Sequence, residues 1–259
     1  MTDLSGAFLE IPIWILGLAL FVAMLAASEI GRALFERHKK AAHLSAAGDE
    51  FSLTAVLGLL ALLIGFTFSL SLQRFDERRV LVVKEANAIG TTWLRMDLLD
   101  EAPRESLRAL LKRYVAVRVD YGTAPNQKAE SDASQLTEQL QQQIWTQVTA
   151  AVFPQRTTAL APLVVSTTND MIDAAGERSA SRSSHIPARL LETLALYCLA
   201  AAGLIGYQRG RYRVATTLVF LLIVASLAII VDLDRPATGA VTVSQQPMID
   251  LLKSMGNAP

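Results

Sequence analysis

Net charge and cysteine are the two features that this sequence most lacks. Its 259 residues carry 24 lysines and arginines against 24 aspartates and glutamates, so the formal charge is zero. A zero net charge provides no overall attraction to nucleic acid, and we predict no nucleic-acid partner. The only cysteine, Cys198, has no second thiol to pair with and no nearby metal ligands, so we expect a small buried side chain there.

Motifs for catalysis and for bound cofactors are also missing. The sequence contains no phosphate-binding glycine loop, nucleophile elbow, zinc-ligand pattern or dinucleotide fingerprint. Its three histidines are scattered, and His38 and His43 lack the spacing of a helical metal pair. We therefore expect a protein that is not an enzyme, with no metal site and no cofactor.

Strand-type alternation and repeats of fixed period are absent as well, which favours an all-α protein. What the sequence has instead is a set of four stretches almost free of charge, at residues 11–27, 51–72, 188–207 and 214–231. Each approaches the ~20 helical residues that cross a hydrocarbon core of ~30 Å. We predict four transmembrane helices. The first lacks a preceding lysine or arginine and a convincing cleavage site, so we expect it to be retained.

The segment between the second and third spans is too long for a loop without its own structure. Helical periodicity appears there three times, at residues 103–121, 134–153 and 157–179, and a linker is predicted at 179–187. We therefore divide the chain into spans 1 and 2 (1–73), a helical extramembrane domain (74–187), spans 3 and 4 (188–232) and a tail (233–259). The tail carries a short amphipathic helix that we expect to dock on the helical domain of the same or a neighbouring subunit.

The second span runs into charged sequence without a proline. From residue 51 to about 99 only small residues interrupt the helical pattern. This predicts one helix of ~70 Å, at 1.5 Å per residue, that leaves the membrane and enters the helical domain.

Residues four apart lie nearly above one another on a helix, which gives the second span distinct ridges. Small residues form one ridge, consisting of Ala61, Gly65 and Ser69. Ridges of this kind allow close helix packing, within a subunit or between subunits.

A neighbouring apolar ridge consists of Ile64, Phe68 and Leu72. In a ring of identical subunits these side chains would form stacked constrictions that gate by dewetting. By pattern alone, ordinary contact with lipid or with the protein core is the more common outcome.

Charged residues follow the span at Arg74, Asp76, Glu77 and Arg78. Their helical spacing permits ion pairs on a solvated face, which is the default interpretation. The sharper alternative is a charged ring at a pore mouth. In such a ring Arg74 would favour anions, whereas Asp76 or Glu77 would favour cations.

Basic residues in short connections indicate which side of the membrane each part occupies. Arginines and lysines lie in the first and last connections, which predicts that both are cytoplasmic and that the helical domain is periplasmic. Basic residues beside the second span, Arg74, Arg78, Arg79 and Lys84, favour the opposite orientation, but residues of long domains weigh less in the rule. The basic residues of the two connections are Arg32, Arg37, Lys39, Lys40, Arg209, Arg211 and Arg213.

Three segments together resemble a known family: "GFTFSLSLQRFDERR", "EANAIGTTWLR" and "VDLDRPATGAVTVSQQP". The combination resembles the bacterial bestrophin-like domain family over nearly the whole chain. A more distant similarity connects it to the bestrophin channels, whose second span carries a similar pattern. Here Phe66, Arg74, Phe75, Glu77 and Arg79 stand in the corresponding relative places.

The resemblance implies a bestrophin-like fold and an ion channel with inorganic ions as its cargo. Bestrophins are pentamers with four spans per subunit, a hydrophobic neck on the second span and a helical domain between the second and third. By that resemblance the chain is expected to be a homo-oligomer, a pentamer, in a bacterial inner membrane, and the Ile64, Phe68 and Leu72 ridge becomes the expected neck.

Two features depart from the bestrophin pattern. Only Asp232 and Asp234, followed by Arg235, stand where calcium-regulated members carry a dense acidic run, so we predict no calcium clasp. The bestrophin domain is also cytosolic, whereas the basic residues here place it outside. A second hypothesis therefore stays open: a non-conducting sensory or binding protein whose helical domain contacts an envelope component.

Overall fold

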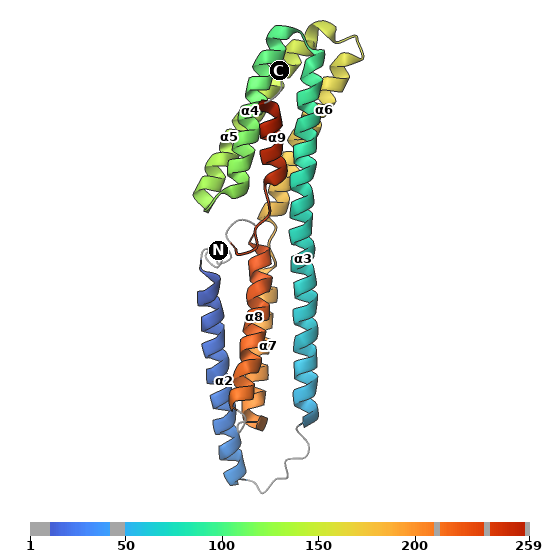
Figure 1. Ribbon diagram of the computed structural model, residues 1–259. Helices are drawn as coiled ribbons and strands as arrows, with labels where there is room; N and C mark the ends of the chain where they lie inside the picture. Colours follow the sequence, from blue (N-terminus) through green and yellow to red (C-terminus); the bar gives the residue numbers. More distant parts are fainter. Residues whose placement is uncertain (1–10, 42–49, 210–212, 236–238, 257–259) are drawn as a thin grey trace. The chain divides into compact units, whose positions relative to one another are not determined.

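A computed structural model describes residues 11–41, 50–209, 213–235 and 239–256. These residues form α-helices and two short 3-10 turns, without any strand (Figure 1). The described part of the chain includes four helices that are long and apolar enough to cross a membrane. The predictions of an all-α fold and of four membrane-spanning helices are confirmed.

The chain divides into two compact units. The first, here called the membrane unit, comprises residues 1–73 and 185–235, and the second, the helical unit, comprises residues 74–184 and 236–259. Helix α3 (Glu50–Arg95) contributes residues to both. Its 46 residues correspond to about 69 Å, so the sequence between the apolar and charged segments is helical throughout, as predicted.

The membrane unit contains three further helices, α2 (Ile13–Ala41), α7 (Ala188–Arg209) and α8 (Arg213–Asp234). Helices α2 and α7 approach each other closely because glycines face backbone at two levels. A Cβ added to Gly31 would collide with the carbonyl of Gly203, and one added to Gly206 would collide with the carbonyl of Ser28. Any larger residue would therefore push these two helices apart.

The helical unit is built from α4 (Glu101–Thr123), α5 (Gln127–Val152), α6 (Leu160–Ser183), α9 (Gln246–Gly256) and the 3-10 turns η1 (Met96–Leu98) and η2 (Phe153–Gln155). Helix α5 begins earlier than predicted because Asn126 caps it, accepting a bond from the amide of Ala129 at 2.9 Å. The predicted apolar stripes face one shared core. Its fully buried members include Ile89, Leu107, Tyr114, Leu140, Ile144, Val164 and Met171.

The predicted linker at residues 179–187 is partly wrong, because α6 continues to Ser183. Serine-rich sequence has a weak helical tendency, and contacts distant in the sequence overcome it here. The buried Arg78 guanidinium donates to the carbonyl of Ser181 at 3.4 Å and to that of Ser184 at 2.7 Å. The Ser181 carbonyl also accepts from the Ser184 amide at 3.3 Å, and the bond to Ser184 satisfies a carbonyl just past the end of α6.

The tail helix α9 packs against α4, and its Met248 and Met255 side chains are fully buried in the core of the helical unit. Pro247 stands in its first turn, where a missing amide hydrogen costs nothing. Within the chain, the tail is therefore part of the core and not an appendage.

Candidate functional site: the exposed face of α3

Helix α3 has a buried side and an exposed side within the membrane unit. The buried side carries Leu53, Leu60, Thr67 and Ser71. The Ser71 hydroxyl donates to the carbonyl of Ile230 on α8 at 2.8 Å, and the Thr67 hydroxyl donates to its own helix. These hydroxyls are thus satisfied by backbone and need no water-filled path.

The apolar ridge lies at the edge of the exposed side. Ile64 is half-buried against the core of the membrane unit, whereas Phe68 and Leu72 are each 41% exposed. Phe66 is 66% exposed. At 100° per residue, Phe66 and Phe68 point about 160° apart, so they occupy opposite flanks of the exposed side at nearly the same depth.

The ridge of small residues lies at the centre of the exposed side. Ala61, Gly65 and Ser69 are all exposed, and a Cβ added to Gly65 would meet nothing within 4 Å. Within the described chain, therefore, no helix packs against Gly65.

Exposed apolar side chains continue on α3 and η1 beyond the apolar stretch, among charged residues. Val80 is 64% exposed and Leu94 is 67% exposed, and Val83 and Leu98 are also exposed. On a helix of 3.6 residues per turn, Val80, Val83 and Leu94 fall on the same side as Gly65. The side of α3 that carries Gly65 is therefore largely exposed in the described chain, except near Gly90, where Leu251 of α9 lies close.

The four charged candidates have different surroundings. Arg74 is half-buried and donates to the Ser184 hydroxyl at 3.2 Å, and the exposed Asp76 pairs with Arg79 at 3.3 Å. Glu77 is exposed. Arg78 differs from the expectation for a pore mouth, because it is buried against the end of α6 as described above.

A buried charge cluster in the helical unit was not anticipated from the sequence. Glu85 of α3 is fully buried and accepts bonds from Arg118 of α4 and from Arg178 of α6, the latter at 2.6 Å. Arg178 also donates to the Gln245 side chain at 2.5 Å. The cluster thus joins α3, α4, α6 and the tail. A signal for it exists in retrospect, because Glu85 and Arg118 occupy positions within the apolar stripes of their helices.

Tyr121 supports this cluster from α4. The guanidinium carbons of Arg118 and Arg182 lie 4.4 and 4.9 Å from its ring centroid, which is favourable for cation–π contact. Burial lowers the pKa of Arg178 below its ordinary value, and the Glu85 carboxylate only partly opposes this. For Arg118, burial acts in the same direction, but Glu85 outweighs it and raises the pKa.

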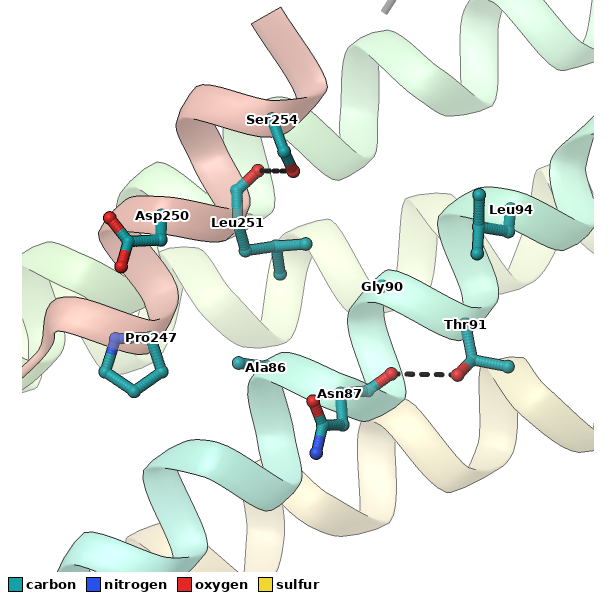
Figure 2. Close-up of a pocket in the computed structure, with 9 residues that line it drawn as sticks. All are labelled: Ala86, Asn87, Gly90, Thr91, Leu94, Pro247, Asp250, Leu251 and Ser254. Carbon is teal, nitrogen blue, oxygen red and sulfur yellow. Dashed lines mark hydrogen bonds between the residues drawn. The ribbon is translucent and has the colours of Figure 1, made fainter.

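An open groove of about 560 Å³ separates α3 from α9 in the helical unit (Figure 2). Leu251 of α9 points toward Gly90 of α3, and a Cβ added to that glycine would lie 3.4 Å from the leucine side chain. The rest of the α3 wall consists of Ala86, Asn87, Thr91 and Leu94. The groove therefore opens on the uncovered side of α3. Among the residues described, no group of three histidine, cysteine or acidic side chains is placed to hold a metal ion.

Comparison with known proteins gives a consistent result. The sequence profile of the Bestrophin-like domain matches residues 16–248. No curated protein matches the sequence. A crystal structure of a bacterial bestrophin homologue from Klebsiella pneumoniae is similar, with 16% identity, a TM-score of 0.68, and coverage of 93% of this chain and 99% of that one.

Two variant structures of a bestrophin homologue from the same organism are similar too. One has 15% identity and a TM-score of 0.68, the other 16% identity and a TM-score of 0.61, and each alignment covers 93% of this chain and 99% of the other. At this identity the structures establish the shared fold, while the profile covers most of the sequence. The chain belongs to the Bestrophin-like domain family.

Proposed function

We propose that this chain forms an oligomeric ion channel in which α3 surrounds the pore. The observation that carries the proposal is the uncovered side of α3. Lipid can cover apolar residues within a membrane, but Val80, Val83 and Leu94 lie beyond the apolar stretch among charged residues. Exposed apolar side chains in such a segment favour contact with other subunits. Further copies of the same chain are the simplest partners.

The ridges of α3 suggest how the copies are arranged. We propose that the small ridge of Ala61, Gly65 and Ser69 contacts the neighbouring subunit, because it has room for a closely approaching helix. The flank with Phe68 and Leu72 then turns toward the axis, and Ile64 completes the neck as its half-buried first ring. Stacked apolar rings of this kind gate by losing water.

Charged residues just past the neck would line the pore mouth. Arg74, Asp76 and Glu77 are the candidates, and their opposite charges leave selectivity to the rotation of α3 about its axis. Arg78 is better explained as a cap for α6. In this proposal the ions are cargo, and the chain is not an enzyme.

The wider assignment follows the family. We propose a homo-oligomer, a pentamer by resemblance to bestrophins, in a bacterial inner membrane. Residues 74–187 form the extramembrane domain between spans 2 and 3, and residues 188–232 form spans 3 and 4. The tail at 233–259 docks on the extramembrane domain. Basic residues in the two short connections support a periplasmic position for the domain.

The test is conductance of the purified oligomer in planar bilayers under an asymmetric salt gradient, comparing the natural protein with Phe68→Ala. Removing the ring widens and wets the neck, so we expect conductance or leak to rise severalfold without loss of assembly. Phe66→Ala is a matched control, because it removes the same side chain from the opposite flank of α3.

Each outcome decides between specific alternatives. Currents that change with Phe68→Ala and not with Phe66→Ala support the pore and its neck. Currents that change with Phe66→Ala and not with Phe68→Ala would support a pore in which the flank with Phe66, and not the flank with Phe68, faces the axis. Intact oligomers that carry no current in any variant would contradict the channel and favour a sensory or binding protein that contacts an envelope component.

A further inference from the structure

A small polar cavity lies in the membrane unit, where α2, α7 and α8 meet. Its volume is about 90 Å³. Its polar wall includes Ser28, Glu29, Arg32, Arg213 and Thr216. Two arginines and three hydroxyls, the third from Thr217, therefore converge on one space from α2 and α8, helices far apart in the sequence.

The cavity lies at the boundary between apolar and charged sequence. Charges on α2 begin at Glu29 after a long apolar run, and Arg213 immediately precedes the apolar run of α8. Leu25 and Phe220 line the cavity on its apolar side. Leu25 lies about one turn before Glu29 on α2, and Phe220 lies about two turns after Arg213 on α8, so both belong to the apolar runs of their helices. The cavity thus presents polar groups at one end and apolar groups at the other, as expected at a membrane surface.

Close backbone contacts between α2 and α7 hold the walls in place. Gly206, which also lines the cavity, lies against the backbone of Ser28, and Gly31 against that of Gly203. Helices α2 and α7 cannot separate or rotate here without losing this backbone contact. The positions of Ser28, Glu29 and Arg32 are consequently fixed relative to α7.

Of the two arginines that line the cavity, one has no acidic partner among the described residues. Arg32 forms an ion pair with Glu29 on the same helix. In the part of the chain that the structure describes, Arg213 has no ion pair and its side chain makes no hydrogen bond. The described residues that line the cavity therefore carry a net charge of +1, which complements one anionic group.

We propose that this cavity binds the phosphate of an anionic phospholipid headgroup. Arg213 and Arg32 would donate charge-assisted bonds to the phosphate oxygens, with Ser28 and Thr216 supplying hydroxyl donors. The acyl chains would run along Leu25 and Phe220. Free phosphate shares the polar chemistry but lacks the chains, so it would leave the apolar side of the cavity without a partner.

The test measures binding by calorimetry to the detergent-solubilised full chain. The ligands are short-chain phosphatidylglycerol, phosphatidylcholine of the same chain length and inorganic phosphate, at one ionic strength. We expect phosphatidylglycerol to bind most tightly, and Arg213→Gln and Arg32→Gln each to weaken it by about tenfold. Arg37→Gln removes the same charge from an exposed site on α2 outside the cavity and should bind normally.

The remaining outcomes separate the alternatives. Arg213→Lys should retain most of the preference, which shows that loss in Arg213→Gln reflects charge and not misfolding. Inorganic phosphate binding as tightly as phosphatidylglycerol would overturn the lipid assignment. Equal weakening by Arg37→Gln would overturn the site and point to general surface charge. Equal affinity for phosphatidylcholine would overturn the requirement for an anion.

Discussion

Single residues in the helical unit show how strongly its core depends on buried charge. Glu85 is surrounded by Arg118 and Arg178, and it is the acceptor that keeps both guanidinium groups paired in the interior. A buried ion pair adds little stability compared with apolar packing, but breaking one leaves an uncompensated charge. The energetic importance of the cluster therefore lies mainly in the cost of disrupting it.

Glu85→Ala is expected to lower the free energy of unfolding by about 3 kcal/mol or more, because two arginines lose their shared acceptor. The measurement is chemical denaturation of the full chain in detergent, followed by tryptophan fluorescence, with Trp93 in the same core as a reporter. Lys84→Ala is the control. It truncates the side chain next to Glu85 in the sequence, whose ion pair with Glu177 is exposed, and should change the free energy of unfolding by less than about 1 kcal/mol. Equal losses in the two variants would contradict a special role for the cluster.

Tyr114 makes the stability of the folded state depend on pH. Burial raises the pKa of its hydroxyl from 10.0 to about 12. The folded state therefore holds this proton more tightly than the unfolded state, so the contribution is complete below pH 10 and is lost as the pH rises through about 12. We expect the natural protein to lose more stability over this range than Tyr114→Phe. If the free energy of unfolding falls equally with pH in the two proteins, Tyr114 is not the source of the pH dependence.

At the scale of elements, the tail is held by side-chain contacts that require a particular glycine. Gln245 is buried, and its amide donates to the carbonyl of Val243 at 2.8 Å while its oxygen accepts from Arg178. Gly122 of α4 lies directly against the side chains of Gln245 and Arg178. The tail and α4 therefore pack together at a point where no Cβ fits.

Gly122→Ala is expected to destabilise the docked tail, because its Cβ would collide with Gln245 and lie 2.5 Å from Arg178. Overpacking of this kind costs about 1–3 kcal/mol. Faster hydrogen exchange in α9 would be the readout. Gly176→Ala is the matched control: it has nothing within 4 Å, and it should stabilise α6 by about 0.5–1 kcal/mol through helix propensity. Unchanged exchange in Gly122→Ala would show that the packing yields without cost.

At the scale of the whole molecule, the side of the membrane proposed for the extramembrane domain is open to a direct test. Basic residues of the short connections favour a periplasmic domain, whereas bestrophin channels, which the chain resembles, hold theirs in the cytosol. In the proposed channel, the two orientations would reverse the direction in which ions meet the proposed neck and charged mouth.

A single-cysteine experiment decides the orientation. In a Cys198→Ala background, we expect cysteine at the exposed Glu138 of α5 to react with a membrane-impermeant maleimide in intact spheroplasts, and cysteine at Glu36 of α2 to react only after lysis. The opposite labelling pattern would place the domain in the cytoplasm, as in bestrophins.

The sequence alone determined the four spans, the continuous α3 and the inward faces of α4 and α5, because apolar residues at helical spacing must be removed from water wherever they lie. Leu163 is an exception, since helical periodicity predicts it on the inward stripe of α6 and it is exposed. The tertiary structure alone decided the Glu85 cluster, the cap that Arg78 places on α6, and the cavity between α2, α7 and α8. Each joins residues tens or hundreds of positions apart, so local periodicity carries no information about which charges meet.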